Sequence, residues 1–270
     1  MTFSQEELIH WNQRGVFPGP FESEESFLSR IAAIEKHAPP QNEISASDFQ
    51  GAYHIVHSHY DCAPDWVHGF YSDANLPPWQ GAAAWFTDDA IPLIQLKTGF
   101  RKGSYLKFYQ RDEVLAHELA HCARVNFHEP KFEEILAYRT AKNPLRRWFG
   151  PLFRHSWESY LFAILLLCPM IGNFLMMFWE SSLILKLFAN LPWIMLCLLF
   201  ARLASIQWIF SRAIKKIQSH LSNPKMAYAV AFRLTDQEIC DFALSSPDKL
   251  KRMIKNQSSL RWVVLRARYF

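Results

Sequence analysis

An apolar run constrains this chain more than any other feature of its sequence. Residues 159–179 contain no charged side chain, and a helix of that length can cross a bilayer core of about 30 Å. A second apolar run, residues 183–210, carries Lys186 and Arg202 near its ends and Pro192, a residue that can kink a helix. Because backbone polar groups in lipid must be hydrogen-bonded within the chain, we expect a transmembrane helical hairpin over residues 158–211. The alternative is a very hydrophobic core hairpin in a soluble protein.

Basic residues flank the expected hairpin on both sides. Arg139, Lys142, Arg146, Arg147 and Arg154 precede it, Arg212, Lys215 and Lys216 follow it, and the turn between the two runs carries only Glu180. Lysine and arginine collect on the cytoplasmic side of a membrane. We therefore expect an integral protein of the cytoplasmic (inner) membrane, with a cytosolic region at 1–157, the hairpin, and a second cytosolic region at 212–270. Aromatic residues among these charges, Trp148, Phe149, Phe153 and Trp157, are typical of an interfacial belt.

The segment "HELAH", residues 117–121, has the H-E-x-x-H pattern within a stretch that lacks proline and glycine. This composition predicts a helix over about residues 112–125. Helical spacing places His117 and His121 on one face, one turn apart, where two imidazole nitrogens can reach one metal ion. Val114, Leu115, Leu119 and Ala120 border this face and indicate a half-buried helix. An ordinary solvated helix face is the alternative interpretation.

A catalytic zinc site needs a third protein ligand, and two neighbouring glutamates are the candidates. Pro130 is well placed to start a second helix over about residues 130–141, which would return antiparallel to the first. Glu134 then lies opposite the histidine pair, with a small residue, Ala137, allowing close packing. Glu133 remains a rival because the helical register cannot be fixed from the sequence. Glu238 is a weaker one, since "TDQE" forms a capping box that already gives this glutamate a role.

Glu118 follows His117 by about 100° of helical rotation, so it points beside the metal and not at it. Zinc lowers the pKa of a bound water to about 7, and a carboxylate at this place can accept the proton. The chemistry expected of this segment is therefore hydrolysis with Glu118 as the general base.

The segments "HELAH" and "EEILAY" together resemble the gluzincin class of zinc metallopeptidases. The resemblance covers about 30 residues and implies a zinc ion (Zn2+) held by His117, His121 and Glu134, with Glu118 as the base. The family's glutamate motif continues to an aspartate that orients a ligand histidine, whereas this chain has Tyr138 there. Tyr138 is a candidate catalytic residue that would stabilise an oxyanion, and its alternative role is to pack the helix pair.

The neighbouring apolar hairpin makes the chain similar to membrane-embedded gluzincins of the HtpX and CAAX prenyl protease class. In those proteins a transmembrane pair separates H-E-x-x-H from the metal-binding glutamate, whereas here Glu134 precedes the pair. The resemblance implies an α+β, zincin-like, mainly helical metalloprotease domain with a small β-sheet and an inserted transmembrane hairpin.

The remaining segments supply further elements of that fold. Residues 4–37 predict two helices, "AAWF", "IPLIQLK" and "SYLKFYQ" predict strands of a small sheet, and "TGFRKG" predicts a turn. A strand beside a metal site can hold an extended peptide through main-chain hydrogen bonds, or it can simply cover the helix. In the last 47 residues we expect a helix after Thr235, another that begins at Pro247, and a final β-like run, "LRWVVLRARYF".

Composition limits the kinds of partner that the chain is expected to bind. The net charge of +4 is small and the basic residues form no single stripe, so nucleic acid is not an expected partner. Five scattered cysteines without a C-x-x-C pair suit a reducing compartment. The sequence predicts a membrane-anchored zinc endopeptidase that acts on proteins or peptides at or in the membrane. The alternative is a non-catalytic membrane scaffold with a structural or vestigial metal site.

Overall fold

The computed structural model describes residues 3–77, 80–87, 91–106, 109–179 and 183–270. Three helices begin the chain: α1 (Gln5–Gln13), α2 (Glu24–Lys36) and α3 (Ala46–Tyr60). A serine precedes each of them, and its hydroxyl accepts a hydrogen bond from a backbone amide of the first turn. The two helices predicted over residues 4–37 are confirmed.

A three-stranded sheet follows, with the order β1–β3–β2. The central strand β3 (Pro92–Leu96) pairs parallel with β1 (His68–Tyr71) and antiparallel with β2 (Ala82–Phe86). Strands β2 and β3 were predicted, whereas β1 was not. Strand β2 pairs with β3 alone among the described strands, so no described strand covers its other edge, where the carbonyl of Ala82 accepts a hydrogen bond from the side-chain amide of Gln80.

Short elements connect this sheet to the helix that carries the histidines. The predicted turn "TGFRKG" is a 3-10 helix, η1 (Thr98–Lys102), because successive amides there bond three residues back. The predicted strand "SYLKFYQ" instead contains two short antiparallel strands, β4 (Ser104–Tyr105) and β5 (Tyr109–Gln110). Residues 107–108 of that run lie outside the described residues.

Helix α4 (Arg111–Ala123) packs against α3 and contributes Leu115, Ala116 and Leu119 to the core. It is followed by η2 (Val125–Phe127), α5 (Glu133–Tyr138), α6 (Pro144–Phe149) and η3 (Gly150–Leu152). Helix α5 is shorter than the predicted 130–141. The amides of Lys131 and Phe132 donate to the carboxylate of Asp236, which holds these residues in a loop and delays the start of the helix.

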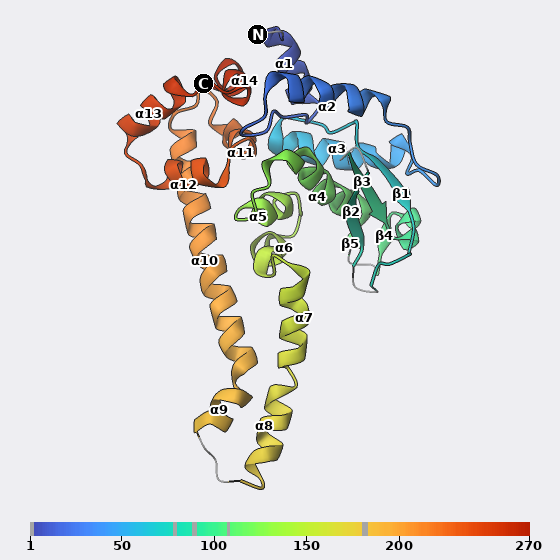
Figure 1. Ribbon diagram of the computed structural model, residues 1–270, viewed down its shortest axis with the longest axis vertical. Helices are drawn as coiled ribbons and strands as arrows, with labels where there is room; N and C mark the ends of the chain where they lie inside the picture. Colours follow the sequence, from blue (N-terminus) through green and yellow to red (C-terminus); the bar gives the residue numbers. More distant parts are fainter. Residues whose placement is uncertain (1–2, 78–79, 88–90, 107–108, 180–182) are drawn as a thin grey trace.

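The predicted apolar hairpin projects from the rest of the molecule (Figure 1). It consists of α7 (Ser156–Leu165), α8 (Cys168–Met176), α9 (Leu183–Ala189) and the long α10 (Leu191–Gln218). The first arm is not one continuous helix, because Pro169 lies in the first turn of α8 and has no amide to donate. Similarly, Pro192 starts α10 and does not kink a longer helix.

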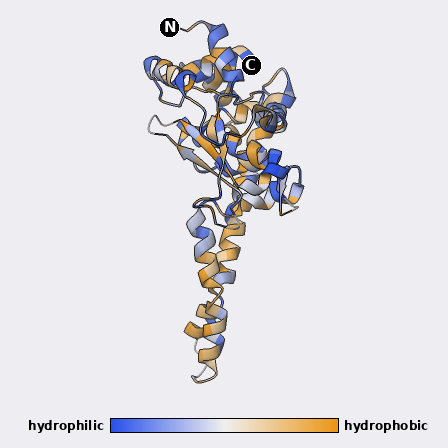
Figure 2. Cartoon of the chain, turned by 90° about the vertical axis from the view of Figure 1, so that its right-hand side faces the viewer, coloured by the Kyte–Doolittle hydropathy of each residue, from blue (hydrophilic) through white to orange (hydrophobic). Residues whose placement is uncertain are grey.

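Two stretches, Ser156–Met176 and Leu191–Gln218, are long and apolar enough to cross a membrane. Only 11% and 28% of their most apolar windows are buried within the molecule, and hydrophobic residues make up much of the projecting arms (Figure 2). These values argue against the core hairpin of a soluble protein. Arg202 pairs with Glu158 at 2.5 Å and so connects α10 to α7.

The last part of the chain is helical: η4 (Pro224–Met226), α11 (Ala227–Ala231), α12 (Asp236–Leu244), α13 (Pro247–Asn256) and α14 (Leu260–Arg268). The capping box at Thr235 and the helix that begins at Pro247 are confirmed. The prediction of a final β-like run was wrong. Trp262, Leu265 and Tyr269 are buried at helical spacing, and this burial against the core outweighs the strand preference of the β-branched residues. The described chain is therefore mostly helical with a small mixed sheet.

Candidate metal centre

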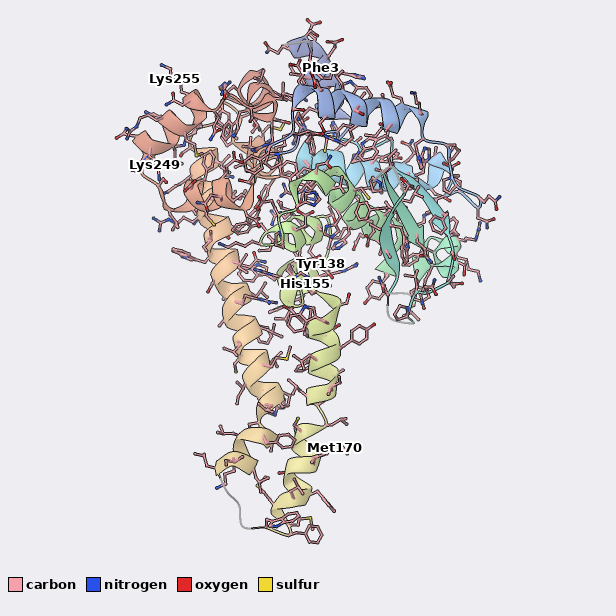
Figure 3. All side chains as sticks on the ribbon, viewed as in Figure 1. Phe3, Tyr138, His155, Met170, Lys249 and Lys255 are labelled. Carbon is pink, nitrogen blue, oxygen red and sulfur yellow. The ribbon has the colours of Figure 1, made fainter. Side chains whose placement is uncertain are left out.

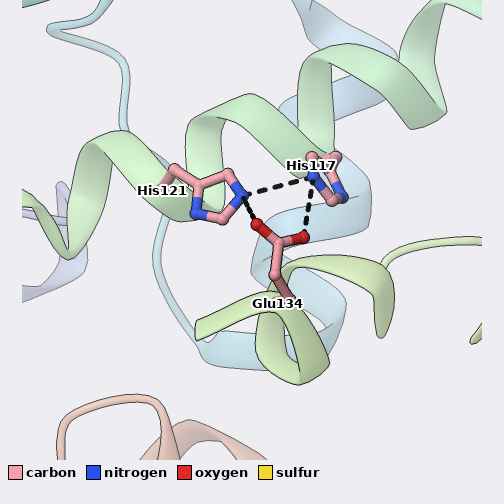
Figure 4. A group of neighbouring side chains, drawn as sticks. All are labelled: His117, His121 and Glu134. Atoms are coloured by element: carbon pink, nitrogen blue, oxygen red, sulfur yellow. Dashed lines mark hydrogen bonds and ion pairs between the residues drawn. The ribbon is translucent and has the colours of Figure 1, made fainter. Parts of the chain in front are cut away.

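Helices α4 and α5 bring the predicted ligands together. His117 and His121 project from one face of α4, and Glu134 projects toward them from the first turn of α5 (Figure 4). The two imidazole Nε2 atoms are 3.2 Å apart. The carboxylate oxygens of Glu134 lie 3.8 Å from Nε2 of His117 and 3.5 Å from Nε2 of His121.

These distances fit the donor spacing of a small tetrahedral ion. Zinc–ligand bonds of about 2.0–2.1 Å place neighbouring ligand atoms roughly 3.3 Å apart. The three side chains offer two nitrogens and a carboxylate oxygen that lie within 4.8 Å of one another. Among the described residues, no other group of three histidine, cysteine, aspartate or glutamate side chains has such an arrangement. The donor set could therefore hold a metal ion.

Glu133 does not compete with Glu134 as the third metal ligand, because Glu133 faces a different atom of His121. One carboxylate oxygen lies 3.1 Å from Nδ1 of His121, and the other accepts a hydrogen bond from Nε of Arg124 at 2.7 Å. Arg124 is fully buried and also donates to the carbonyl of Phe232 before α12. Glu133 thus orients the ring of His121, which is the contact that the replacement by Tyr138 had put in doubt.

The direction of the pKa shift differs among the residues of the cluster. Burial acts to lower the pKa of His121, but the hydrogen bond and charge of Glu133, with the charges of Glu134 and Glu118, outweigh it and raise that pKa to about 9. For His117, burial and the charges of His121 and Arg146 lower the pKa well below its usual value. Burial raises the pKa of Glu134. Three carboxylates in this small volume make a site that a divalent cation would neutralise.

Glu118 lies beside the cluster and lines the same pocket. Burial, assisted by the charge of Glu134, raises its pKa to about 7 against the opposing charge of His121. No described residue donates a hydrogen bond to its carboxylate. A carboxylate in this setting can exchange a proton near neutral pH.

Tyr138 also lies at the site, at the end of α5. Its ring is 4.5 Å from the ring of His117, measured between centroids, at an angle of 67°. Burial and the charge of Glu134 raise its pKa to about 12, so the hydroxyl keeps its proton at neutral pH. Gly150 permits this position, because a Cβ atom there would overlap the tyrosine ring.

The pocket above the cluster has a volume of about 380 Å³. His117, Glu134 and Tyr138 form one part of its wall, the start of β2 (Ala82) forms another, and the beginning of α7 (Ser156, Tyr160) forms a third. Figure 3 shows Tyr138 and His155 where the hairpin joins the rest of the molecule. The site therefore opens between an unpaired strand edge and the first turn of an apolar helix.

The structure brings together four of the site residues predicted from the sequence: His117, His121, Glu134 and Glu118. The weaker candidate, Glu238, lies elsewhere and is bonded to Arg261 and Trp262. Reasoning from the sequence missed Arg124 and the orienting role of Glu133. Helical spacing was the available signal for Arg124, which is one turn after His121 and shares its face. No protein-family model, curated protein or solved structure matches this chain.

Proposed function

We propose that the chain is a membrane-anchored, zinc-dependent endopeptidase with a zincin-like core. The observation that carries this proposal is the convergence of His117, His121 and Glu134 next to a carboxylate, Glu118, that is not itself a ligand. A purely structural zinc site is closed by four protein ligands and has no use for such a carboxylate.

In the proposed reaction, His117, His121 and Glu134 would hold the ion, and Glu133 would keep His121 in register. Zinc, when bound, supplies a Lewis acid that polarises the scissile carbonyl and makes water more acidic. Glu118 accepts a proton from the attacking water and then delivers it to the amine that leaves. Tyr138, protonated at neutral pH, donates a hydrogen bond to the carbonyl oxygen as negative charge develops there.

The substrate proposed is an extended protein or peptide segment at or in the membrane. The edge of β2 that no described strand covers offers backbone amides and carbonyls that could pair with such a segment, and Ala82 of this strand lines the pocket. Ser156 and Tyr160 bring the opposite wall to the start of the apolar hairpin, where a membrane surface would lie. These neighbours support a substrate that reaches the site from the membrane.

The proposed anchor is the pair of apolar helices, with both termini on the cytosolic side. Basic residues on both flanks support this orientation. Tags at the two termini should then react with an impermeant reagent only from the cytosolic side. Recovery of the whole chain in the soluble fraction without detergent would contradict the membrane part alone.

Metal content and proteolysis of the purified protein test the enzymatic part. Wild-type protein in detergent should hold about one zinc per chain and cleave membrane-derived peptides, with activity lost on chelation and regained on adding zinc. The variant His121→Ala should lose both, whereas His57→Ala, which changes an exposed histidine of α3, should lose neither. Zinc-free wild-type protein would refute the site. Zinc without cleavage would favour the scaffold.

A further inference from the structure

A second pocket, of about 300 Å³, lies between α5, α6, α10 and α11. Three of the residues that line it are cationic: Arg139, Arg147 and Lys215. None of its lining residues is acidic. Its composition differs from that of the pocket at the metal centre, which is lined by Glu118 and Glu134, and it favours a negatively charged ligand.

The charges in this pocket are not neutralised by the protein. Within the described part of the chain, none of the three cations forms an ion pair, and Nε of Arg139 is buried without a hydrogen-bond partner. The guanidinium of Arg139 lies over the ring of Tyr228 at 4.1 Å, and Arg147 donates only to the carbonyl of Ala141. Both guanidinium groups are thus held in place with donors to spare, as in a site that grips an anion.

The positive charge of Arg139 and Arg147 also affects a neighbouring histidine. The pKa of His59 is lowered to about 4, first by burial and then by the charges of Arg139 and Arg147. The positive charge of the two arginines disfavours a cation nearby. The same charge favours an anion.

The pocket lies where the apolar part of α10 ends. Four polar residues of α10, Gln207, Ser211, Lys215 and Gln218, line it at a helical spacing. Earlier in the same helix the exposed residues are apolar, as at Leu198. Figure 1 shows α5 and α6 beside α10 at the base of the projecting hairpin. In a membrane this is the level of the phospholipid headgroups.

Trp148 lies between the charged pocket and the apolar surface of the hairpin. It lines the pocket and remains 54% exposed, and Trp208 on α10 is 56% exposed. Exposed tryptophans of this kind are typical of the interface between headgroups and acyl chains. The apolar surface thus continues from the pocket toward the membrane-facing part of α10, along which acyl chains can lie.

We propose that this pocket binds the phosphate of an anionic phospholipid headgroup. The paired guanidinium groups of Arg139 and Arg147 match the oxygens of a phosphate, and Lys215 adds a point charge. Free phosphate offers the same oxygens but no acyl chain to occupy the surface near Trp148. The proposal rests on the membrane insertion proposed above and is independent of the metal centre.

The test measures lipid binding to the full-length protein in detergent by native mass spectrometry, with phosphatidylglycerol and phosphatidylcholine as probes. The wild type should retain phosphatidylglycerol in preference to phosphatidylcholine. Lys215→Gln should weaken phosphatidylglycerol binding about fivefold, and Arg147→Gln with Lys215→Gln roughly 25-fold, because each basic residue contributes about equally. Binding of phosphatidylcholine should not change.

A matched control removes two exposed charges elsewhere, with Lys249→Gln and Arg252→Gln on α13. Figure 3 shows Lys249 at the end of the molecule remote from the hairpin tip. The side chain of Lys215 is exposed and makes no hydrogen bond to a described residue, so its single variant should fold, and thermal melting checks this. Zinc content should be the same in all variants.

Three results would overturn the proposal. Equal losses in the α13 control would mean that binding is diffuse electrostatics. Displacement of the lipid by inorganic phosphate alone, at the same affinity, would make free phosphate the ligand. Failure of the wild type to retain either lipid would refute membrane insertion as well, and zinc content would show whether the metal centre stands without it.

Discussion

Two side-chain clusters that contain buried or half-buried carboxylates, one at α4–α5 and one between α12 and α14, differ in how fully the carboxylate charge is compensated. Glu238 accepts hydrogen bonds from the Thr235 amide at 2.8 Å, from Arg261 at 2.7 and 3.0 Å, and from the Trp262 indole at 2.6 Å. Burial acts to raise its pKa, but these donors outweigh burial and lower it. Glu118 has no comparable donors within the described ranges of the chain, and burial raises its pKa to about 7.

The difference separates a carboxylate that maintains the fold from one that is available for chemistry. A fully bonded carboxylate such as Glu238 has a stable charge and no free lone pair facing a pocket. Glu118 faces the pocket beside two histidines, with a pKa in the range where a general base works best. Glu133 is intermediate, because burial acts to raise its pKa but Arg124 and His121 outweigh burial and lower it, while Glu133 orients the histidine.

The largest effect is expected from breaking the structural cluster. Glu238→Gln would leave Arg261 as a buried charge without its partner, and the loss of one member of such a pair lowers the free energy of unfolding by about 3–5 kcal/mol. Denaturant unfolding in detergent would measure this loss. Zinc content per folded molecule should remain normal, and loss of zinc with unchanged stability would place Glu238 at the metal centre.

The next effect is on catalysis. Glu118→Gln should leave the zinc content and the fold intact while lowering the cleavage rate by about 10²-fold or more, roughly 3 kcal/mol of barrier, because an amide cannot accept the proton from water. The measurement compares peptide cleavage by wild type and variant at matched zinc content. Equal rates would show that another base, or a contaminant, is responsible.

A smaller effect separates the two neighbouring glutamates. Glu133→Gln should weaken zinc retention by about tenfold, the lower end for a residue that orients a ligand, whereas Glu134→Gln should weaken it further. Competition with a chelator of known affinity would measure both. The reverse order of the two variants would exchange their roles, with Glu133 as the ligand.

Much of the metal centre was predictable because its residues are close in sequence and helical spacing decides which of them share a face. His117, His121 and Glu134 follow from that rule. The start of α5 at Glu133 was not predictable, since it depends on hydrogen bonds from Lys131 and Phe132 to Asp236, about a hundred residues away. Sequence spacing carries no signal for such contacts.

The distinction between local sequence patterns and contacts of distant residues also applies to the fold. The apolar runs and the strands β2 and β3 have strong local patterns and were predicted. Strand β1 contains Gly69 and is stabilised by parallel pairing with β3 and by close packing of that glycine against Ile44 and Phe49, which are non-local contacts. The terminal helix α14 has residues with strand preference, and only its burial against the core makes it helical.

The smallest effect is a pH dependence of stability in the metal-free protein. Because the pKa of Glu118 is raised from 4.5 to about 7 on folding, the native state holds a proton that the unfolded state lacks between these values. The free energy of unfolding should therefore fall as pH rises through this window, by about 1 kcal/mol from roughly pH 5.5 to 6.5. Glu118→Gln removes this contribution.

Glu238 provides the contrast within the same molecule. Its pKa is lowered below 4.5 in the folded protein, so it is ionised in both states throughout this window, and its own contribution should be constant there and be lost only at lower pH. His121, with a pKa raised to about 9, is present in the wild type and in Glu118→Gln. The comparison of unfolding curves in the presence of chelator therefore isolates Glu118. Parallel pH profiles for the two proteins would mean that Glu118 is compensated as fully as Glu238, and the distinction between the two clusters would fail.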